Sequence, residues 1–472
     1  MSAGEPSNPL LAYGAWLAAA SGKWPHEAIV AARNAFMDTI GVTIPGAAET
    51  VTRKVFRTVR SWGEGPCTVI GADIRLAAPW AALVNGTAAH ALDFDDNFDP
   101  AKAHASAVLV PAILALAEQE EASGLACIDA YIAGLQIMGR VGQGLNPAHR
   151  NRGWHATATV GAVGAAAACA RLLRLGEREA AFGLSISTSM AGGFMSQFGT
   201  STKPLHAGLA AKAGVLAASL ARHGVDAGLA TLDGPAGMNR LMVGPDLEEL
   251  RAALTHVEHG QTLRFETTSV GEPLLILSSG LKVKRFPNCG SAHRAMDGLL
   301  ALRERHGFTA GDIAEVRVSA PASHLANLMY EAPQNPAQAK FSMEYALATI
   351  ALHGRCALGD FEEAAIGDPD ARAFFARVRR IPVAGSEGEF PTQVEVELTD
   401  GTIHSIAVEM PVGSLAAPLS AGQYEAKFDE CAADLLPAAD LADLKRGIEN
   451  LDNLESITAV TRPLAKECAD HG

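Results

Sequence analysis

Hydrophobic positions recur at helical spacing through the first half of the chain. Apolar side chains fall three and four residues apart, and Gly, Pro and Asn mark the breaks between these stretches. The pattern predicts helices over residues 9–20, 25–44, 77–91, 107–122, 128–142, 157–175, 178–189 and 207–222, with an ordered loop at 231–245. Many of the apolar positions are Ala or Gly, which lets helices approach closely, so we predict a packed all-helical domain.

The pattern changes near residue 272. Residues 313–318 alternate between apolar and polar as a strand does, and residues 392–398 and 403–408 flank an Asp-Gly turn typical of a hairpin. Helical spacing returns at 292–306, 340–353 and 423–464. We therefore predict a mainly α protein, with a discontinuous all-helical domain over 1–271 and 412–472 and a smaller inserted α+β lid domain over 272–411.

Composition excludes several classes of protein. The 472 residues are 48% hydrophobic and 19% charged, which is typical of a globular chain with two or three domains. A formal charge of −14 argues against nucleic-acid and anionic-membrane partners. The seven cysteines form no Cys-x-x-Cys pair, and the N-terminus lacks a signal-peptide pattern, so we expect a soluble, cytoplasmic protein with reduced thiols.

One loop, between the helices predicted at 77–91 and 107–122, is crowded with charged side chains: Asp93, Asp95, Asp96, Asp99, Lys102 and His104. Such crowded carboxylates need a cation, positive side chains or water nearby. Residues 95–99 spell Asp-Asp-x-x-Asp, which on a helix binds magnesium in isoprenoid synthases. The second metal motif of those enzymes is missing and Pro100 ends a helix here, so we expect no metal and keep the isoprenoid enzyme as an alternative.

Later positive side chains can meet these carboxylates. His155 precedes an Ala/Gly-rich helix, whose N-terminus disfavours an imidazolium and attracts an anion. Lys203 stands next to a proline near the start of another helix, and Lys284 and Arg285 precede the helix at 292–306. Taken singly, each of these residues can also be an ordinary surface or buried side chain. Together they predict an enzyme that handles a small polyanion.

Two further side chains have open roles. Cys289 can be a nucleophile, but an inert loop or buried thiol is the commoner case. Tyr330 can donate a hydrogen bond or simply pack. The residues by themselves do not decide between these roles.

Several segments occur in the order found in the MmgE/PrpD family, which the chain resembles over nearly its whole length. They are His90-Ala-Leu-Asp93-Phe-Asp-Asp96, His155 before a small-residue helix, Thr202-Lys203-Pro204-Leu205-His206, Lys284-Arg-Phe-Pro, and Lys340-Phe-Ser342-Met-Glu-Tyr345. The family includes 2-methylcitrate dehydratase, cis-aconitate decarboxylase and iminodisuccinate epimerase. The resemblance implies a homodimer, a helical domain with a smaller α+β lid, and neither a metal nor an organic cofactor.

Carried over position by position, the resemblance implies a site for a small di- or tricarboxylate between the domains. His155 resembles the principal acid/base residue, and the second such group stays open between Asp93, His104 and Lys203. Substrate binding is implied for a further set of residues: Asn97, Lys284, Tyr330, His206, Arg285 and Cys289.

Departures from the family pattern affect the choice of reaction. Asn97 stands where Thr is common, His104 is followed by Ala rather than Pro, and Cys289 stands where the decarboxylases carry His. The shared chemistry, removal of a proton next to a carboxylate, is kept. We rank a hydro-lyase of the 2-methylcitrate dehydratase type first, because it is the family's commonest activity. The loop departures keep an epimerase of iminodisuccinate-like amino polycarboxylates second, and Cys289 puts a cis-aconitate decarboxylase third. A non-catalytic polycarboxylate binder is the other alternative from a different class.

Overall fold

The chain forms two compact units, Met1–Lys282 with Tyr424–Gly472, and Val283–Gln423. The computed structural model describes residues 8–254, 257, 259–384, 390–433 and 435–465. The unit boundaries follow Lys282 and Gln423, whereas the sequence pattern placed them after residues 271 and 411. Segment 272–282 belongs to the first unit because Leu275 donates its N–H to Gln136, and Lys282 pairs with Asn97 through both backbone groups. Residues 1–7, on which the expected absence of a signal peptide rests, lie outside the described residues. Cys468 also lies outside them.

The first unit is helical, apart from the short antiparallel pair β1 (Glu64–Thr68) and β2 (Arg75–Leu76). Its helices up to residue 282 are α1 (Pro9–Ala19), α2 (His26–Ala48), α3 (Thr50–Val59), α4 (Ala78–Ala91), α5 (Ser106–Gln119), α6 (Gly124–Leu145), α7 (Ala148–Asn151), α8 (Ala156–Leu172), α9 (Glu177–Thr188), α10 (Thr202–Arg222), α11 (Met238–Val243), α12 (Leu247–Ala253) and α13 (Leu275–Ser278). The C-terminal segment adds α20 (Ala421–Ala432), α21 (Ala438–Glu449) and α22 (Thr458–Thr461).

Each helix predicted in the first half is present, with corrections at three places. Helix α2 continues through Pro45, because a proline in the last turn of a helix breaks few hydrogen bonds. Helix α10 begins at Thr202 rather than at 207, because Pro204 fits a first helical turn. The predicted loop 231–245 contains the short helix α11.

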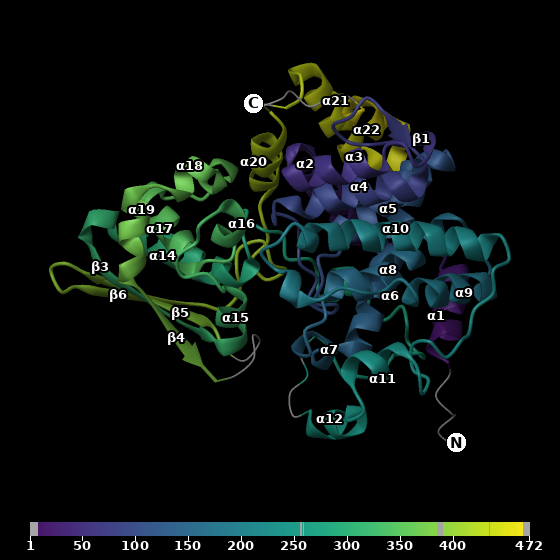
Figure 1. The fold of residues 1–472 in the computed structure, drawn as a ribbon, viewed down its shortest axis with the longest axis horizontal. Helices are drawn as coiled ribbons and strands as arrows, with labels where there is room; N and C mark the ends of the chain where they lie inside the picture. Colours follow the sequence, from purple (N-terminus) through teal and green to yellow (C-terminus); the bar gives the residue numbers. More distant parts are fainter. Residues whose placement is uncertain (1–7, 255–256, 258, 385–389, 434, 466–472) are drawn as a thin grey trace. The chain divides into compact units, whose positions relative to one another are not determined.

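Helix α10 is the central element of the first unit and packs against α4, α8 and α9 (Figure 1). A Cβ on Gly208 would lie 2.2 Å from the carbonyl oxygen of Leu83, and a Cβ on Gly214 would lie 2.3 Å from the Cβ of Ala165 and 2.5 Å from its carbonyl carbon. Only glycine permits so close an approach of the helix backbones. Among the described residues α10 is also the one helix with the length and hydropathy of a membrane span, but 67% of that window is buried, as in a core helix.

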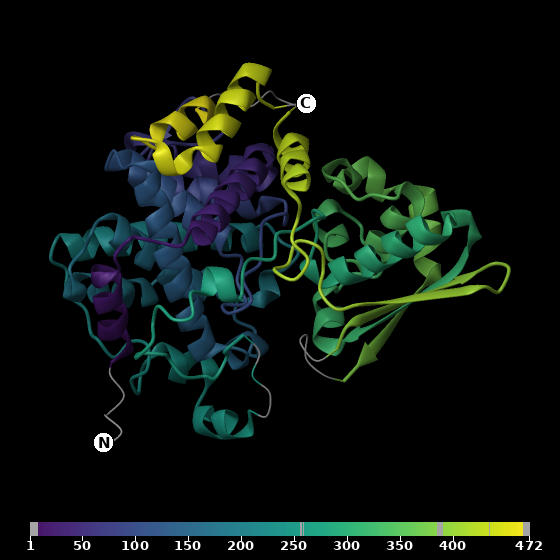
Figure 2. The ribbon, with the colours of Figure 1, turned by 180° about the vertical axis from the view of Figure 1, so that it is seen from behind.

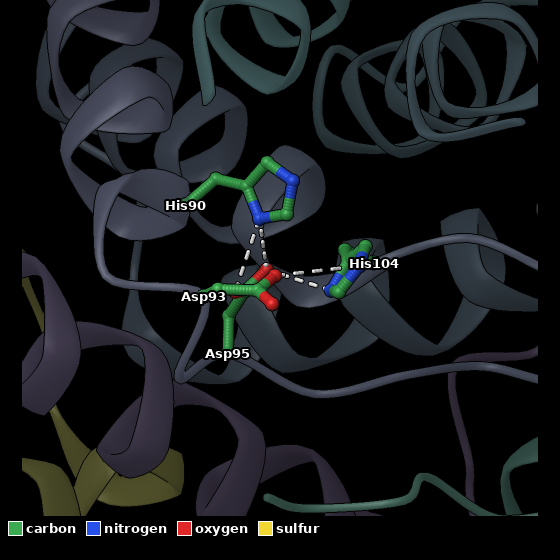
Figure 3. Close-up of side chains that lie close together, drawn as sticks. All are labelled: His90, Asp93, Asp95 and His104. Carbon is green, nitrogen blue, oxygen red and sulfur yellow. Dashed lines mark hydrogen bonds and ion pairs between the residues drawn. The ribbon is translucent and has the colours of Figure 1, made fainter. Parts of the chain in front are cut away.

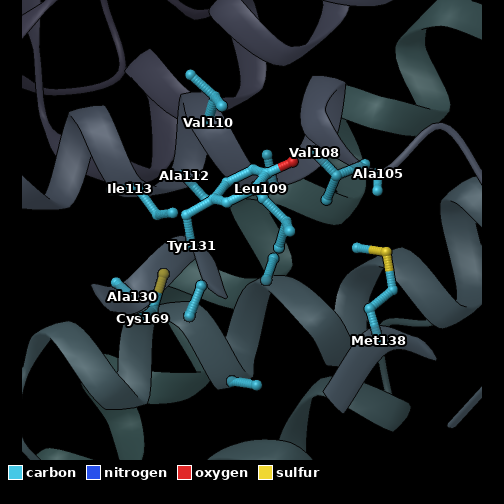
Figure 4. Close-up of a cluster of buried hydrophobic side chains, with 14 of the residues drawn as sticks. Ala105, Val108, Leu109, Val110, Ala112, Ile113, Ala130, Tyr131, Met138 and Cys169 are labelled. Carbon is cyan, nitrogen blue, oxygen red and sulfur yellow. The ribbon is translucent and has the colours of Figure 1, made fainter. Parts of the chain in front are cut away.

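The core of the first unit is built from small and branched side chains on α5, α6 and α8. Val108, Leu109 and Ile113 from α5 meet Tyr131 and Met138 from α6 in one buried cluster (Figure 4). These side chains are almost fully excluded from water, so each contributes on the order of 1–3 kcal/mol of hydrophobic stabilisation. Helix α5, which carries part of this core, begins at Ser106, where the loop after α4 ends.

The second unit contains a four-stranded sheet in the order β4-β3-β5-β6. Its strands are β3 (Ile313–Pro321), β4 (Val378–Val383), β5 (Thr392–Leu398) and β6 (Ile403–Val408). Strand β3 runs parallel to β4 and antiparallel to β5, and β5 and β6 form the hairpin that the Asp-Gly turn predicted. The sequence pattern missed β4, whose Arg379, Arg380 and Pro382 obscure any alternation.

Helices cover one face of this sheet (Figures 1 and 2). Val394 and Val396 of β5 are buried beneath α14 (His293–His306), next to α17 (Met343–His353). The shorter helices of the unit are α15 (Ala322–Asn327), α16 (Pro336–Ala339), α18 (Glu363–Ile366) and α19 (Pro369–Phe374). The chain is therefore mainly α, with α+β structure confined to the second unit.

Candidate active site

The acidic loop between α4 and α5 is not helical, and its carboxylates face different partners. Asp93 pairs with Lys203, Asp95 with His90 and His104, Asp96 with Ser106, and Asp99 with Lys282 and His259. A magnesium-binding Asp-Asp-x-x-Asp motif needs its carboxylates on one face of a helix. The isoprenoid-enzyme alternative is therefore wrong for this segment.

Lys203 and Asp93 form a buried ion pair. Lys203 lies in the first turn of α10, and its Nζ is 2.5 Å from Asp93 Oδ1. Asp93 has a backbone φ of +54°, in the left-handed region that few residues other than glycine adopt. The ion pair helps to hold this conformation. The ring centroid of Phe198 lies 5.5 Å from Nζ and covers the cation on another side.

His90 and His104 both present their Nδ1 atoms to Asp95 (Figure 3). His90 Nδ1 lies 2.9 and 3.0 Å from the two carboxylate oxygens, and His104 Nδ1 lies 3.2 Å from Oδ2. Burial by itself raises the pKa of Asp95, but the two imidazoles outweigh it and hold that pKa well below the usual value. Burial lowers the pKa of His90 to about 3, although Asp95 opposes the shift.

His155 and His206 form a second pair of buried imidazoles. His155 is the N-cap residue of α8, its backbone N–H donates to Gly193, and its Nδ1 lies 2.9 Å from Nδ1 of His206. Burial lowers the pKa of both, and Lys203 lowers them further, so both rings are neutral near pH 7. Because one Nδ1 must donate and the other accept, the two rings are opposite tautomers.

The two imidazole pairs belong to one cluster. The rings of His90 and His104 are 4.3 Å apart, and those of His90 and His155 are 6.1 Å apart. The ring of Phe198 stands edge-on to His155 at 5.0 Å. The first unit thus gathers four histidines, two carboxylates and one lysine around a largely dry centre, which is an arrangement suited to moving protons near an anion.

Four of these side chains also have the spacing of a metal site. Among the described residues, ligand atoms of His90, Asp93, Asp95 and His104 lie within 4.8 Å of one another. Their oxygens, however, already face the Lys203 ammonium and two imidazole nitrogens. A dication would have to displace the lysine or lie beside it. The geometry therefore favours proton-bearing groups over a metal at this cluster.

The structure places the predicted residues in both units. In the first, it gathers Asp93, His104, His155, Lys203 and His206, and it sets Asn97 on the same loop, paired through its backbone with Lys282. The second unit holds the others.

In the second unit, Cys289 and Tyr330 flank one backbone segment. Cys289 donates its N–H to the carbonyl of Lys340, and Tyr330 donates to that of the adjacent Phe341. Lys284 is buried. The Arg285 guanidinium lies 3.0 Å from Asp297, in a pocket of about 440 Å³ whose lining also includes two glutamates, so its charge is already offset within that unit.

Sequence analysis gave His90 no role, and it pointed to Asp95 only as part of the Asp-Asp-x-x-Asp motif, although both residues stand in the segment that carried the family resemblance. His90 lies in the last turn of α4 and Asp95 follows five residues later, and only the turn of the loop brings them together. A histidine near several aspartates was the available signal, but it does not say which carboxylate is the partner.

A buried lysine from the C-terminal segment binds the backbone of the acidic loop. Lys427 of α20 donates to the carbonyl of Phe94 at 2.8 Å and lies 2.6 Å from Asp38. Asp96 accepts a hydrogen bond from the backbone N–H of Ser106, and burial raises the pKa of Asp96 to about 7. These anchors fix the loop that carries Asp93 and Asp95.

A helical unit with a dry histidine–lysine–aspartate cluster is the scaffold of an acid/base enzyme. The MmgE/PrpD N-terminal domain matches residues 16–250, and the MmgE/PrpD C-terminal domain matches residues 286–453. The chain therefore belongs to the MmgE/PrpD family, as the sequence resemblance indicated. Among curated relatives, it is 27% identical to cis-aconitate decarboxylase of Mus musculus over 444 residues, which is 91% of this chain and 87% of the relative.

Two further relatives are cis-aconitate decarboxylases as well. Cis-aconitate decarboxylase of Homo sapiens is 28% identical over 82% of this chain and 80% of the relative. Cis-aconitate decarboxylase of Aspergillus terreus is 26% identical over 92% and 91%. Decarboxylases are lyases, and this chain is an enzyme of the lyase class.

Proposed function

We propose that this enzyme is a lyase that releases CO₂ from a small unsaturated tricarboxylate of the cis-aconitate type. The observation that carries the proposal is the buried Lys203–Asp93 pair beside two imidazole pairs. Relatives that span most of the chain and are decarboxylases support this choice of reaction. The proposal therefore puts decarboxylation first. The sequence put this reaction third, because Cys289 stands where the decarboxylases carry a histidine.

The chemistry needs a positive charge and a proton donor. When the C–C bond to a carboxylate breaks, CO₂ leaves, and the electron pair passes into the adjacent unsaturated carbons and their remaining carboxylate. Lys203 offers the charge that stabilises this electron-rich species in a poorly hydrated site. A protonated imidazole then supplies a proton to carbon, and the ring becomes neutral.

The charge of Lys203 also explains how a chain with a formal charge of −14 can bind a polyanion. Asp93 neutralises the buried ammonium while no substrate is bound. A substrate carboxylate can take over that role in the complex.

Dehydration of a hydroxylated tricarboxylate is the second candidate, and one observation favours it. The site holds two separate proton-exchanging pairs, His155–His206 and His104–Asp95. Loss of water needs a base for the C–H and an acid for the departing hydroxyl, and two pairs can supply both.

The deciding experiment is proton NMR of the purified enzyme in D₂O with cis-aconitate, 2-methylcitrate, citrate and iminodisuccinate in parallel. Release of CO₂ with one deuterium in the product supports decarboxylation. Elimination of water from 2-methylcitrate or citrate supports the dehydratase. Deuterium exchange at the α-carbon of iminodisuccinate without a new product replaces both with an epimerase. Binding of all four without any reaction overturns the lyase proposal and leaves a polycarboxylate binder.

A matched pair of variants tests the site itself. His155→Gln should lower kcat at least 100-fold and change the substrate Kd by less than fivefold, because His155 is a neutral ring at the reacting centre and adds little to the binding of the substrate charge. His149→Gln is the control, since His149 is equally buried but bonds to Thr159 and lies outside the cluster. A kcat for His155→Gln within a fewfold of wild type excludes His155 from the reacting centre.

A further inference from the structure

We propose that Asp95 and His90 form a positioning pair that keeps His104 protonated and oriented as the proton donor of the reaction. The assignment of a reaction rests on the proposed function, whereas the protonation of His104 does not. The family resemblance implies no role for His90 or Asp95, and the sequence pattern pointed to Asp95 only as part of the Asp-Asp-x-x-Asp motif. The structure gives them one through a histidine–carboxylate–histidine arrangement (Figure 3).

The geometry resembles a carboxylate–histidine dyad with a second histidine behind it. Nδ1 of His104 lies 3.2 Å from the Asp95 carboxylate, and Nδ1 of His90 lies 2.9 Å from it. A carboxylate that binds Nδ1–H fixes the ring orientation and leaves Nε2 to react. His104 Nε2 lies 4.0 Å from Asp93 Oδ1, next to the Lys203 pair, and is therefore the atom on the substrate side of the cluster.

The charges of Asp93, Asp95 and Lys203 leave the cluster one positive charge short of neutrality. Asp93 and Asp95 carry two negative charges, and Lys203 supplies one positive charge, so a proton on an imidazole brings the group to neutrality. His104 is the better carrier, because its side chain is 13% exposed whereas that of His90 is 0% exposed. The two carboxylates favour the charge on His104, and the Lys203 ammonium opposes it.

His90 has a different task from His104. It is fully buried, its Nδ1–H is committed to Asp95, and among the residues that the structure describes its Nε2 has no hydrogen-bond partner. It therefore acts on the site through Asp95. By donating to both oxygens it prevents the carboxylate from rotating away from His104, and it offsets the cost of burying Asp95.

The proton transfer is balanced without any further reagent. The Nε2 proton of His104 passes to the carbon that carries the electron pair after CO₂ loss, while the other proton stays on Nδ1 of His104 and faces the Asp95 carboxylate. The neutral ring then recovers a proton from water at its exposed edge. For a dehydration the same proton passes to the departing hydroxyl.

Three variants and one control variant separate positioning from simple structural support. Asp95→Asn should lower kcat at least 100-fold and leave KM within threefold. His90→Leu should lower kcat at least tenfold, whereas His90→Asn, whose amide N–H stands where Nδ1–H stood, should recover to within threefold of wild type. His149→Gln, a buried histidine outside the cluster, should leave the pH profile of kcat unchanged.

A measurement independent of turnover tests the proposal if no substrate is found. Histidine-¹⁵N NMR against pH, with the His104 signal identified by its loss in His104→Gln, follows the protonation of this ring directly. The titration midpoint of His104 should fall by about one pH unit or more in Asp95→Asn, because the ring loses a carboxylate partner. An unchanged midpoint overturns the proposal, as does a His90→Asn enzyme no more active than His90→Leu. If none of the substrates reacts but the His104 midpoint shifts in Asp95→Asn, only the proposed reaction is contradicted.

Discussion

Lys203 Nζ lies 2.5 Å from Asp93 Oδ1, although 110 residues separate them and each side chain is only 6% exposed. This contact joins the first turn of α10 to a loop residue with a left-handed backbone. Neither charge is stable in so dry a place without the other, because burying an unpaired charge costs several kcal/mol. The pair therefore links the stability of the first unit to the charge of its candidate site.

Replacing Lys203 with Met keeps the length of the side chain and removes its charge. Asp93 is then buried without its ammonium partner, so we expect the free energy of unfolding to fall by about 3–5 kcal/mol at pH 7. Turnover should fall at least 100-fold. Urea unfolding and steady-state kinetics measure the two effects. Lys212→Met is the control on the same helix, because Lys212 lies over the Trp80 ring and has no place in the cluster. Equal losses in both variants would contradict the assignment.

Lys427 is expected to hold the acidic loop through Asp38 and Phe94. Lys427→Met leaves Asp38 buried without its partner and frees the Phe94 carbonyl, so stability should fall by about 3–5 kcal/mol. The double variant with Asp38→Asn should recover part of that loss, since the uncompensated charge is gone. A double-mutant cycle by chemical denaturation measures the coupling. Additive losses would show that the two side chains act separately.

The contact between α10 and α4 should tolerate no side chain at Gly208. A methyl group there meets the Leu83 carbonyl oxygen at 2.2 Å, so we expect Gly208→Ala to destabilise the protein by about 1–3 kcal/mol or more. Gly183 in α9 is the matched control, because its nearest neighbour would be 3.5 Å away. There, alanine should be neutral or stabilise by up to about 1 kcal/mol through helix propensity. The shift in the urea midpoint separates the two results.

Buried neutral histidines should make the protein sensitive to acid. Burial lowers the pKa of His149 from 6.5 to about 3, so between these values the unfolded chain binds a proton that the folded chain does not. Stability therefore falls as the pH drops from 6.5 to 3, by about 1.4 kcal/mol per pH unit for this group. His149→Gln keeps a donor to Thr159 and cannot titrate. Its stability should decline less steeply than that of wild type over this range, and parallel curves would refute the assignment.

The cluster of His90, Asp93, Asp95 and His104 should work without a metal. Its oxygens face an ammonium and two imidazoles, so prolonged dialysis against EDTA should leave both turnover and the melting temperature unchanged. Elemental analysis of the untreated protein checks the same point. Stoichiometric zinc, lost together with activity on chelation and restored with it, would assign these side chains as ligands instead.

Much of the fold followed from local pattern. Apolar spacing predicted the helices of the first half and the β5–β6 hairpin, because these elements satisfy their backbone hydrogen bonds over short stretches of chain. Strand β4 was missed, since its charged residues and proline give no alternation and its place depends on pairing with β3. The unit boundaries also needed contacts, because segment 272–282 binds the first unit through Gln136 and Asn97.

The sequence by itself determined the helical character of the chain, the α+β segment, the family, and the residue types at the site. Only the tertiary structure decided which partners the carboxylates have. Asp93 pairs with Lys203 and Asp95 with two histidines, so the Asp-Asp-x-x-Asp segment is not a magnesium motif. The physical reason is that a loop has no period from which side-chain directions can be read. Its partners come from α4, α8 and α10, and the packing of those helices sets which charges meet.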